Sequence, residues 1–372
     1  MKTFTDISKI SIVINKAFSG KLIDFLHDLG IERIFVESGR SSILGDGKGL
    51  FGIAQTGKLV YDPAEIISIP VAKELESKLM NMVAKEFELS TPGRGAIFST
   101  PLTGVRAHDD YMVYDKLKEM PDEGLQLFDE LIGLDCIVQR GEGDIVARIA
   151  LNAGASVPYT SYGTGTGLRD KLGLLRITIP ADKEIISLIM SKYDVDQVLE
   201  MYISEAKLDE PGRGIAYIYP IGKGLINTRI SSRKNSQAAS MEQIISAIDS
   251  IKGGIEWRKA GLESASLSKR NFLTEMCEIG LVCADGEGQR LSLVAMENGA
   301  GGATISKISY QRPMAEGKQE SSACEYSRMI VSKSSLAQIT EALEKEAAFS
   351  SEIRAMMMVK EVEKAFTYLA RK

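Results

Sequence analysis

Two short turns in the sequence combine residue types that bind anions. Each turn reads Pro-Gly-Arg-Gly, at residues 92–95 and 211–214. Glycine allows successive backbone N–H groups to face one anion, and the arginine guanidinium adds a planar charged fork that suits phosphate. The alternative is a plain tight turn whose arginine faces solvent. The residues predicted to contact phosphate are Gly93, Arg94, Gly95, Gly212, Arg213 and Gly214.

A second glycine-rich segment, residues 163–171, reads Gly-Thr-Gly-Thr-Gly-Leu-Arg-Asp-Lys. Its glycines favour a flexible backbone, and its two basic side chains add positive charge. By contrast, the segment from Gly141 to Asp144 carries two carboxylates that would repel phosphate, so we interpret it as the start of a helix. The candidate ligand-binding residues in the first of these segments are Gly163, Thr164, Gly165, Arg169 and Lys171.

Histidine and cysteine contribute little to the predicted chemistry. The chain has two histidines and four cysteines, with no Cys-x-x-Cys spacing and no Gly-x-Ser-x-Gly elbow. A metal site at His108 and Asp110 is a weaker alternative to a solvated loop. No catalytic residue, metal site or firmly bound cofactor is predicted. The cysteines interpreted as buried structural thiols are Cys136, Cys277, Cys283 and Cys324.

The composition is that of an ordinary globular protein. Of the 372 residues 44% are hydrophobic and 26% are charged, and the net charge of −5 argues against a nucleic-acid partner. No apolar run approaches the roughly 18 residues of a membrane span, and the N-terminus lacks a secretory apolar segment. We therefore expect a cytoplasmic protein.

Internal repeats indicate how the chain is organised. Residues 134–154 and 278–299 share one plan, which is an apolar strand, Gly-Glu-Gly, a helix and a closing glycine. Residues 9–30 follow a similar plan. The Pro-Gly-Arg-Gly similarity extends over eleven positions, 92–102 and 211–221, whereas residues 351–354 read Ser-Glu-Ile-Arg. The sequence thus predicts three related units, of which the third has diverged.

Each unit is predicted to have the order β-α-β-β-α-β, the ferredoxin-like arrangement of the α+β class. In the second unit, Asp182 as a helix N-cap favours a helix over 182–204, after a strand over 173–179. The apolar stripes at helical spacing that define the second helix of the three units are Leu75, Leu79, Met82 and Val83; Ile186, Ile189, Met190 and Tyr193; and Leu336, Ile339 and Leu343.

The predicted units span residues 1–104, 134–222 and 276–372. Residues 105–133 are predicted to be a helical connector, with an amphipathic helix from Asp122 to Leu131. Residues 223–275 are predicted to be a linker. Within it the sequence predicts a polar stretch over 231–240, a helix over Met241–Ile251 and a short strand around Ile255–Trp257.

The second unit resembles the P-II family, and more closely its P-II-like branch of small trimeric signalling proteins. The resemblance rests on GTGTGLRDKLGL at 163–174 and LDEPGRGIAY at 208–217. It is good over 134–222, fair over 8–104 and weak over 276–372. It implies partner-docking T-loops near 39–62 and 162–172. It also implies B-loops at 91–95 and 210–214 that hold nucleotide phosphates between units.

The three units would then form an intrachain pseudo-trimer that buries their apolar sheet faces, or else units of separate chains would assemble. The resemblance implies a regulator of nitrogen or carbon status that binds an adenine nucleotide (ATP, ADP or AMP) at inter-unit clefts. Such a protein would signal to a protein partner through loop conformation. One alternative is an enzyme acting on a phosphorylated or acidic metabolite, although no paired acid and base are evident. Another alternative is a structural assembly protein without a ligand.

Overall fold

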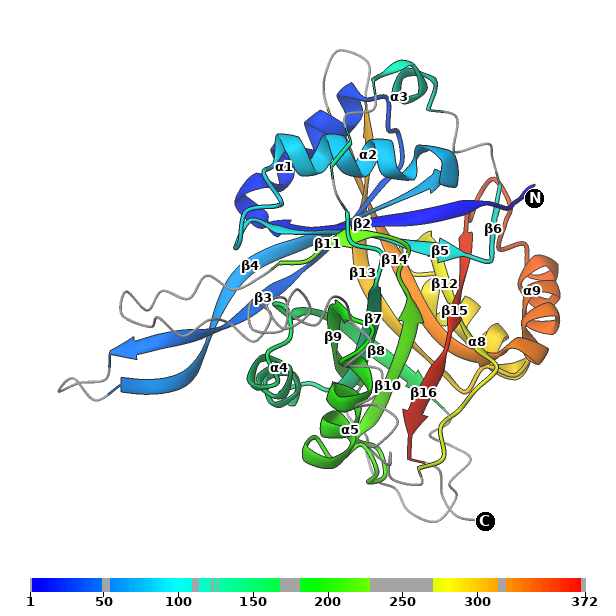
Figure 1. The fold of residues 1–372 in the computed structure, drawn as a ribbon. Coiled ribbons are helices and arrows are strands. Elements are labelled where there is room, and N and C mark those ends of the chain that lie inside the picture. Colours follow the sequence, from blue (N-terminus) through cyan, green and yellow to red (C-terminus); the bar gives the residue numbers. More distant parts are fainter. Residues whose placement is uncertain are drawn as a thin grey trace.

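A computed structural model describes residues 2–48, 54–108, 114–121, 124–125, 127–167, 181–227, 270–313 and 319–368. Within these residues the order β-α-β-β-α-β occurs three times, which places the chain in the α+β class (Figure 1). The first unit consists of β2 (Ile7–Asn15), α1 (Lys16–Asp28), β3 (Ile34–Lys48), β4 (Ala54–Ala72), α2 (Lys73–Glu86) and β5 (Gly95–Leu102).

The second and third units repeat this order. The second consists of β7 (Leu131–Gln139), α4 (Gly143–Asn152), β8 (Tyr159–Gly167), β9 (Asp182–Ser191), α5 (Val195–Glu205) and β10 (Gly214–Pro220). The third consists of β12 (Met276–Ala284), α8 (Gly288–Glu297), β13 (Gly302–Pro313), β14 (Gln319–Ser332), α9 (Leu336–Lys345) and β15 (Met356–Val362). The remaining short elements are β1 (Lys2–Phe4), β6 (Gly104–Ala107), α3 (Asp115–Glu119), β11 (Gly224–Leu225), η2 (Lys333–Ser335) and β16 (Lys364–Thr367).

Local sequence signals set the ends of the first helix in each unit. In α1 the Asn15 side chain accepts a hydrogen bond from the backbone N–H of Ala17 at 2.9 Å, which caps the helix. Gly30, Gly154 and Gly299 follow α1, α4 and α8 with φ values of 80°, 83° and 116°. These left-handed conformations confirm the predicted helix-closing glycines.

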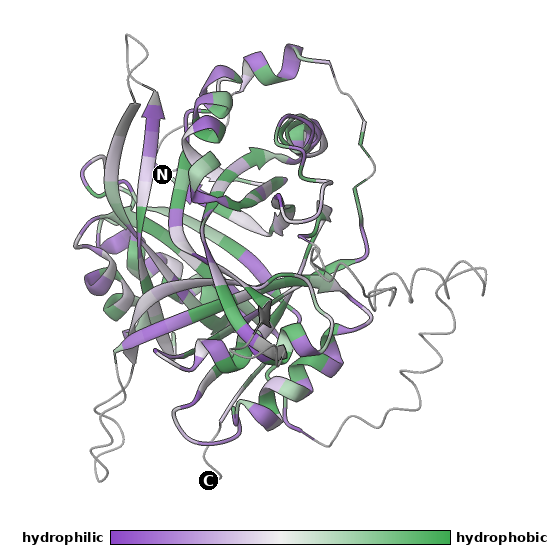
Figure 2. Cartoon of the chain, turned by 90° about the vertical axis from the view of Figure 1, so that its left-hand side faces the viewer, coloured by the Kyte–Doolittle hydropathy of each residue, from purple (hydrophilic) through white to green (hydrophobic). Residues whose placement is uncertain are grey.

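Each unit forms a four-stranded antiparallel sheet with the same strand order. The orders are β3-β4-β2-β5, β8-β9-β7-β10 and β13-β14-β12-β15. The two helices of a unit pack on one face of its sheet and form a separate apolar core with it. Figure 2 shows both apolar and hydrophilic residues along the strands and along the helices.

The three sheets are joined at both kinds of edge. The short strands extend the outer edges in a cycle, because β11 pairs with β5, β16 pairs with β10 and β6 pairs with β15. At the inner edges, β3, β8 and β13 pair with one another. Each unit therefore completes the sheet of a neighbour, and apolar residues from all three units form a shared core.

The helix predicted over 182–204 is wrong in its first half, because residues 182–191 form strand β9. The misleading signal is a run of residues that are apolar on both faces of the strand. Ile186, Leu188 and Met190 pack against the helices of the second unit, whereas Ile185 and Ile189 join the core shared between units. The helix follows as α5, with Val195, Val198, Leu199, Tyr202 and Ile203 as its buried residues.

The amphipathic helix predicted from Asp122 to Leu131 is also wrong, because the described residues of that segment are not helical. Phe128 instead forms a β-bridge with Gly224, and Leu131 begins β7. Among the described residues of this connector, the helix is α3, which ends before Pro121. The features predicted over 173–179 and within 231–257 lie outside the described residues. None of the helices in the described ranges combines the length and apolar character needed to cross a membrane.

A glycine in β12 makes room for a buried tyrosine, and its substitution should destabilise the fold. A Cβ atom at Gly280 would lie 2.3 Å from Oη of Tyr326. We expect Gly280→Ala to lower the free energy of unfolding by about 1–3 kcal/mol in urea titrations, because the packed ring must shift. Gly104→Ala is the control, since no atom lies within 4 Å of its Cβ position. Equal stability of the two variants would contradict this packing.

Candidate functional site

The first Pro-Gly-Arg-Gly turn connects α2 to β5 and faces the second unit. The backbone N–H of Gly93 donates a hydrogen bond of 3.1 Å to Oδ1 of Asn227, which lies just after β11. Gly95 has a φ of 144°, and a Cβ there would lie 2.3 Å from the Val13 carbonyl oxygen. This glycine is therefore required by the approach of β5 to β2, whatever the turn binds.

The Arg94 guanidinium is half-exposed and already has one anionic partner. It lies 2.9 Å from a carboxylate oxygen of Glu88 and 5.8 Å from the ring centre of Phe18. Beside it is a pocket of about 260 Å³, slightly below the roughly 300–1,000 Å³ of drug-sized sites. The pocket combines aromatic rings with charges of both signs, from Phe18, Phe25, Phe87, Lys21, Arg94, Glu86 and Glu88.

The second turn has the same architecture, but its arginine pairs with two carboxylates instead of one. Arg213 binds Glu142 at 2.6 Å and Glu210 at 3.1 Å, and these hydrogen bonds raise its pKa above the usual value. The carbonyl of Gly212 accepts a bond from Gln139, and that of Gly214 accepts one from Thr367 in β16 of the third unit. Both turns thus face a segment donated by the next unit.

The Gly-Glu-Gly turns start helices, as predicted, and each binds a carboxylate of its own unit. Oε2 of Glu184 accepts hydrogen bonds from the backbone N–H groups of Gly141 and Gly143 at 2.9 and 2.8 Å. In the third unit, Glu325 accepts from Gly288 at 2.6 Å. The N–H groups at these helix N-termini therefore already have an anionic acceptor within the protein.

The predicted basic loop at 163–171 is not a loop in its first half. Residues 163–167 belong to β8, where Thr164 and Gly165 pair with Ile305 and Thr304 of β13. A Cβ at Gly163 would lie 2.9 Å from Cγ2 of Thr304, so the absence of a side chain at Gly163 allows β8 to lie close to β13. Arg169 and Lys171 lie outside the described residues.

The structure does not bring the described part of this segment, residues 163–167, onto the second turn. Gly214 of β10 is opposite Val138 of β7, which is opposite Glu184 of β9, and Glu184 is opposite Tyr162 of β8. Three strand spacings of about 4.8 Å separate the turn from residues 162–163, which is roughly 14 Å. One phosphate cannot contact both the turn and residues 162–163.

The other predicted partner-docking segment, 39–62, is an extension of β3 and β4 in its described part (Figure 1). Arg40 and Tyr61 attach this hairpin to the start of α4 in the second unit. The guanidinium lies 2.7 Å from Oδ1 of Asp144, and the Tyr61 hydroxyl donates to Oδ2 at 2.5 Å. The Arg40 guanidinium also lies 4.3 Å from the Tyr61 ring centre. Sequence reasoning missed this contact, because it joins residues more than 80 positions apart.

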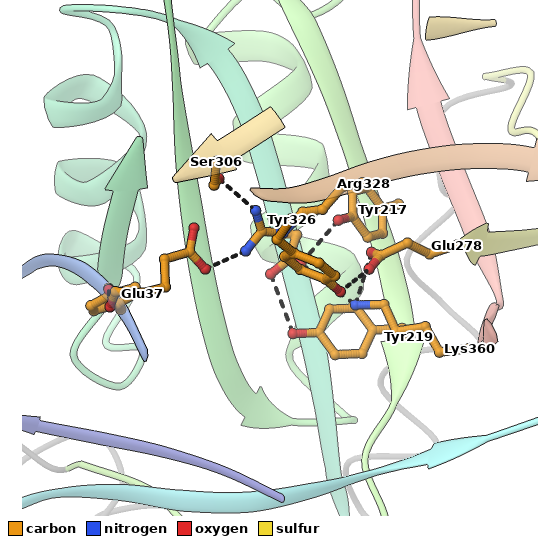
Figure 3. A network of polar contacts seen from close by, with 10 residues as sticks. Glu37, Tyr217, Tyr219, Glu278, Ser306, Tyr326, Arg328 and Lys360 are labelled. Atoms are coloured by element: carbon orange, nitrogen blue, oxygen red, sulfur yellow. Dashed lines mark hydrogen bonds and ion pairs between the residues drawn. The ribbon is translucent and has the colours of Figure 1, made fainter. Parts of the chain in front are cut away.

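A buried polar network at the junction of the three units was also missed (Figure 3). Lys360 lies 2.9 Å from Glu278 of its own unit and 3.7 Å from Asp135 of the second unit. The hydroxyls of Tyr217 and Tyr219 donate to Asp135 at 3.0 and 3.2 Å. These side chains sit on neighbouring strands, and no local motif marks them.

Arg328 connects the third unit to the first within the same junction. It pairs with Glu37 of β3 and donates to the Ser306 hydroxyl at 2.8 Å. Burial alone would lower the pKa of Arg328, but the Glu37 carboxylate raises it above the usual value. Lys9 of the first unit is partly buried nearby, and burial together with Lys360 lowers its pKa to about 8.

The cysteines are free thiols, and three of them are buried as predicted, whereas Cys324 is only partly buried. Burial raises the pKa of Cys136 and of Cys283, which keeps both thiols protonated. His108 Nδ1 lies 3.2 Å from the Phe349 carbonyl oxygen. Within the described ranges no group of three metal-ligating side chains converges, and Asp110 lies outside those ranges.

Comparison with known proteins adds little to this geometry. No family model matches the chain, and no curated protein matches it. Among solved structures, an aspartate kinase from Synechocystis aligns over 96% of this chain and 44% of that chain. The TM-score is 0.21 and the sequence identity is 9%, so this likeness carries no argument.

The Glu184 carboxylate that binds the Gly-Glu-Gly turn of the second unit should contribute to stability. We expect Glu184→Gln to lower the free energy of unfolding by about 1.5–3 kcal/mol, because two backbone N–H groups lose a charged acceptor. Glu205→Gln, at an exposed position in α5, is the matched control and should change it by less than about 0.5 kcal/mol. Chemical denaturation at pH 7 measures both. A neutral effect of Glu184→Gln would show that the N–H groups need no anion.

The junction should make the protein sensitive to acid. Burial of Glu278 opposes its ionisation, but Lys360, Lys9 and Arg328 lower its pKa from 4.5 to about 2. Stability from this carboxylate is therefore fully present above pH 4.5 and is lost as the pH falls toward 2. We expect the stability difference between the wild type and Glu278→Gln to shrink across this range, by up to about 3 kcal/mol. A difference that stays constant with pH would contradict the assignment.

Proposed function

We propose that this chain is a P-II-like regulatory protein whose three units form an intrachain pseudo-trimer and bind a small anionic ligand between units. The observation that carries the proposal is that, in the cyclic arrangement of the units, each Pro-Gly-Arg-Gly turn contacts a segment that follows the neighbouring unit. Gly93 of the first unit contacts Asn227 in the segment that follows the second unit, and Gly214 of the second unit contacts Thr367 in the segment that follows the third. A ligand at either turn would therefore contact two units at once.

The first cleft is the better candidate for the ligand site. Arg94 pairs with one carboxylate whereas Arg213 pairs with two, so an incoming anion has less to displace at Arg94. The pocket beside Arg94 is lined by residues of the first unit alone and adds Lys21 and the rings of Phe18, Phe25 and Phe87. Aromatic faces beside two cations suit a flat ring that carries phosphate, and ATP, ADP and AMP have this chemistry.

Signalling would use the hairpin of β3 and β4. Figure 1 shows it projecting away from the rest of the first unit, as expected of an element that docks a protein partner. Its base contacts Asp144, two residues from the Glu142 that pairs with Arg213. The pathway, regulation of nitrogen or carbon status, rests on the family resemblance alone.

A second candidate is a structural assembly protein that binds no ligand. Two observations at the turns favour this candidate. Strand packing alone requires Gly95 and Gly214, and both arginines already have carboxylate partners within the protein. The two candidates differ in one measurable property, which is a melting temperature that rises with nucleotide concentration.

Thermal stability is first measured against ATP, ADP and AMP, and the best ligand is then titrated by calorimetry. We expect Arg94→Ala to weaken binding roughly ten- to a hundredfold, because a charge-assisted hydrogen bond contributes about 1.5–3 kcal/mol. Arg213→Ala should likewise weaken binding at the second cleft. Arg354→Ala, in the third unit without the turn, is the control and should retain wild-type affinity.

Equal affinities of the wild type, Arg94→Ala and Arg213→Ala would remove the phosphate role from both turns. The absence of any melting shift with all three nucleotides would favour the structural candidate. Each alanine variant should retain wild-type stability within about 1 kcal/mol, because exposed ion pairs contribute little.

A further inference from the structure

The junction network consists of three cations and three carboxylates contributed unequally by the three units. The side chains of Glu37, Asp135, Glu278, Arg328 and Lys360 are each at most 10% exposed. Lys9 completes the set, and its ammonium lies 5.9 Å from the ring centre of Tyr326. The first unit contributes one charge of each sign, the second contributes only a carboxylate, and the third contributes two cations and one carboxylate.

The strand registers show which positions of the three units are equivalent. Lys9, Gly133 and Glu278 lie opposite Thr100, Tyr219 and Lys360, respectively, in the matching strand pairs. One position thus holds a cation, a glycine and a carboxylate in the three units. A Cβ at Gly133 would lie 2.3 Å from the Tyr219 ring, so this glycine makes room for that tyrosine.

The other charged positions follow the same rule. Asp135 is equivalent to Ser11 of the first unit and Gly280 of the third. In the matching strand pairs, Asp135 lies opposite Tyr217, Ser11 lies opposite Phe98 and Gly280 lies opposite Met358. Arg328 is equivalent to Ser68 and Ser187, and Glu37 to Ser161 and Ser306. At none of these positions do two units carry the same charge.

We infer that this network makes the junction selective for one copy of each unit and so disfavours assemblies in which a second copy of the chain places the same unit twice in one junction. A junction with two second units would bury two Asp135 carboxylates for one set of cations. A junction with two third units would bury surplus positive charge. Buried charges without partners strongly destabilise an interface, whereas this arrangement is balanced. The inference needs no ligand and is independent of the proposed function.

The test uses the full-length chain with the Glu37–Arg328 pair, which joins the first and third units. Glu37→Gln with Arg328→Met removes both charges together, a change that buried pairs can tolerate without loss of the fold. Copies labelled at the N-terminal amine with a donor or an acceptor dye are unfolded in urea, mixed and refolded. Energy transfer reports multi-chain species, and light scattering gives their mass.

We expect the wild type to refold to a single-chain species with little energy transfer. The neutralised double variant should show roughly tenfold more multi-chain species. Lys307→Met is the control, since Lys307 pairs with Asp285 and Glu325 of its own unit, and it should behave as the wild type. Equal multi-chain fractions for the wild type and the double variant would overturn the inference.

A second comparison covers the case in which the neutralised variant does not fold. Glu37→Arg and Arg328→Glu alone place like charges together, whereas the two combined restore an oppositely charged pair. We expect each single variant to lose the single-chain species and the combined variant to regain at least part of it. A combined variant that is no better than the single variants would show that this pair does not select the arrangement.

Discussion

Each unit completes the outer sheet edge of a neighbour, and the rest of the structure depends on this exchange of short strands. An open sheet edge leaves backbone N–H and C=O groups unpaired and invites association with other chains. Here β11, β16 and β6 cover β5, β10 and β15 in a cycle. Because every unit both gives and receives a strand, none has a complete sheet alone. The contacts of Gly93 with Asn227 and of Gly214 with Thr367 likewise depend on this arrangement.

The cycle brings three unlike sheet faces together, and their side chains divide the interior into apolar and polar regions. Apolar residues of all three units form a shared core, which includes Val13, Ile189 and Val362. The charges of Asp135, Lys360 and their partners meet nearby. Apolar burial is non-directional and would accept many arrangements, whereas buried charges accept only those in which each has a partner. Affinity and selectivity between units thus come from different residues.

The residues of the two Pro-Gly-Arg-Gly turns have structural roles and are also the candidate ligand-binding residues. Gly95 and Gly214 permit close strand approach, while Arg94 and Arg213 pair with carboxylates beside each turn. A ligand phosphate would therefore exchange with an internal carboxylate rather than enter an empty site. Such an exchange costs little at half-exposed arginines and would change the contacts of the segment that carries the carboxylate.

The sequence alone was sufficient to predict the three β-α-β-β-α-β units, the helix-closing glycines and the turns, because each depends on local periodicity or on glycine at a fixed place. It misassigned residues 182–191, since a strand buried on both faces lacks the alternation that distinguishes it from a helix. Tertiary structure decided the rest. The contacts of Arg213 with Glu142 and of Arg40 with Asp144, the cyclic strand exchange and the charged junction all join residues distant in sequence. Pairing at a distance leaves no periodic signal within any one segment.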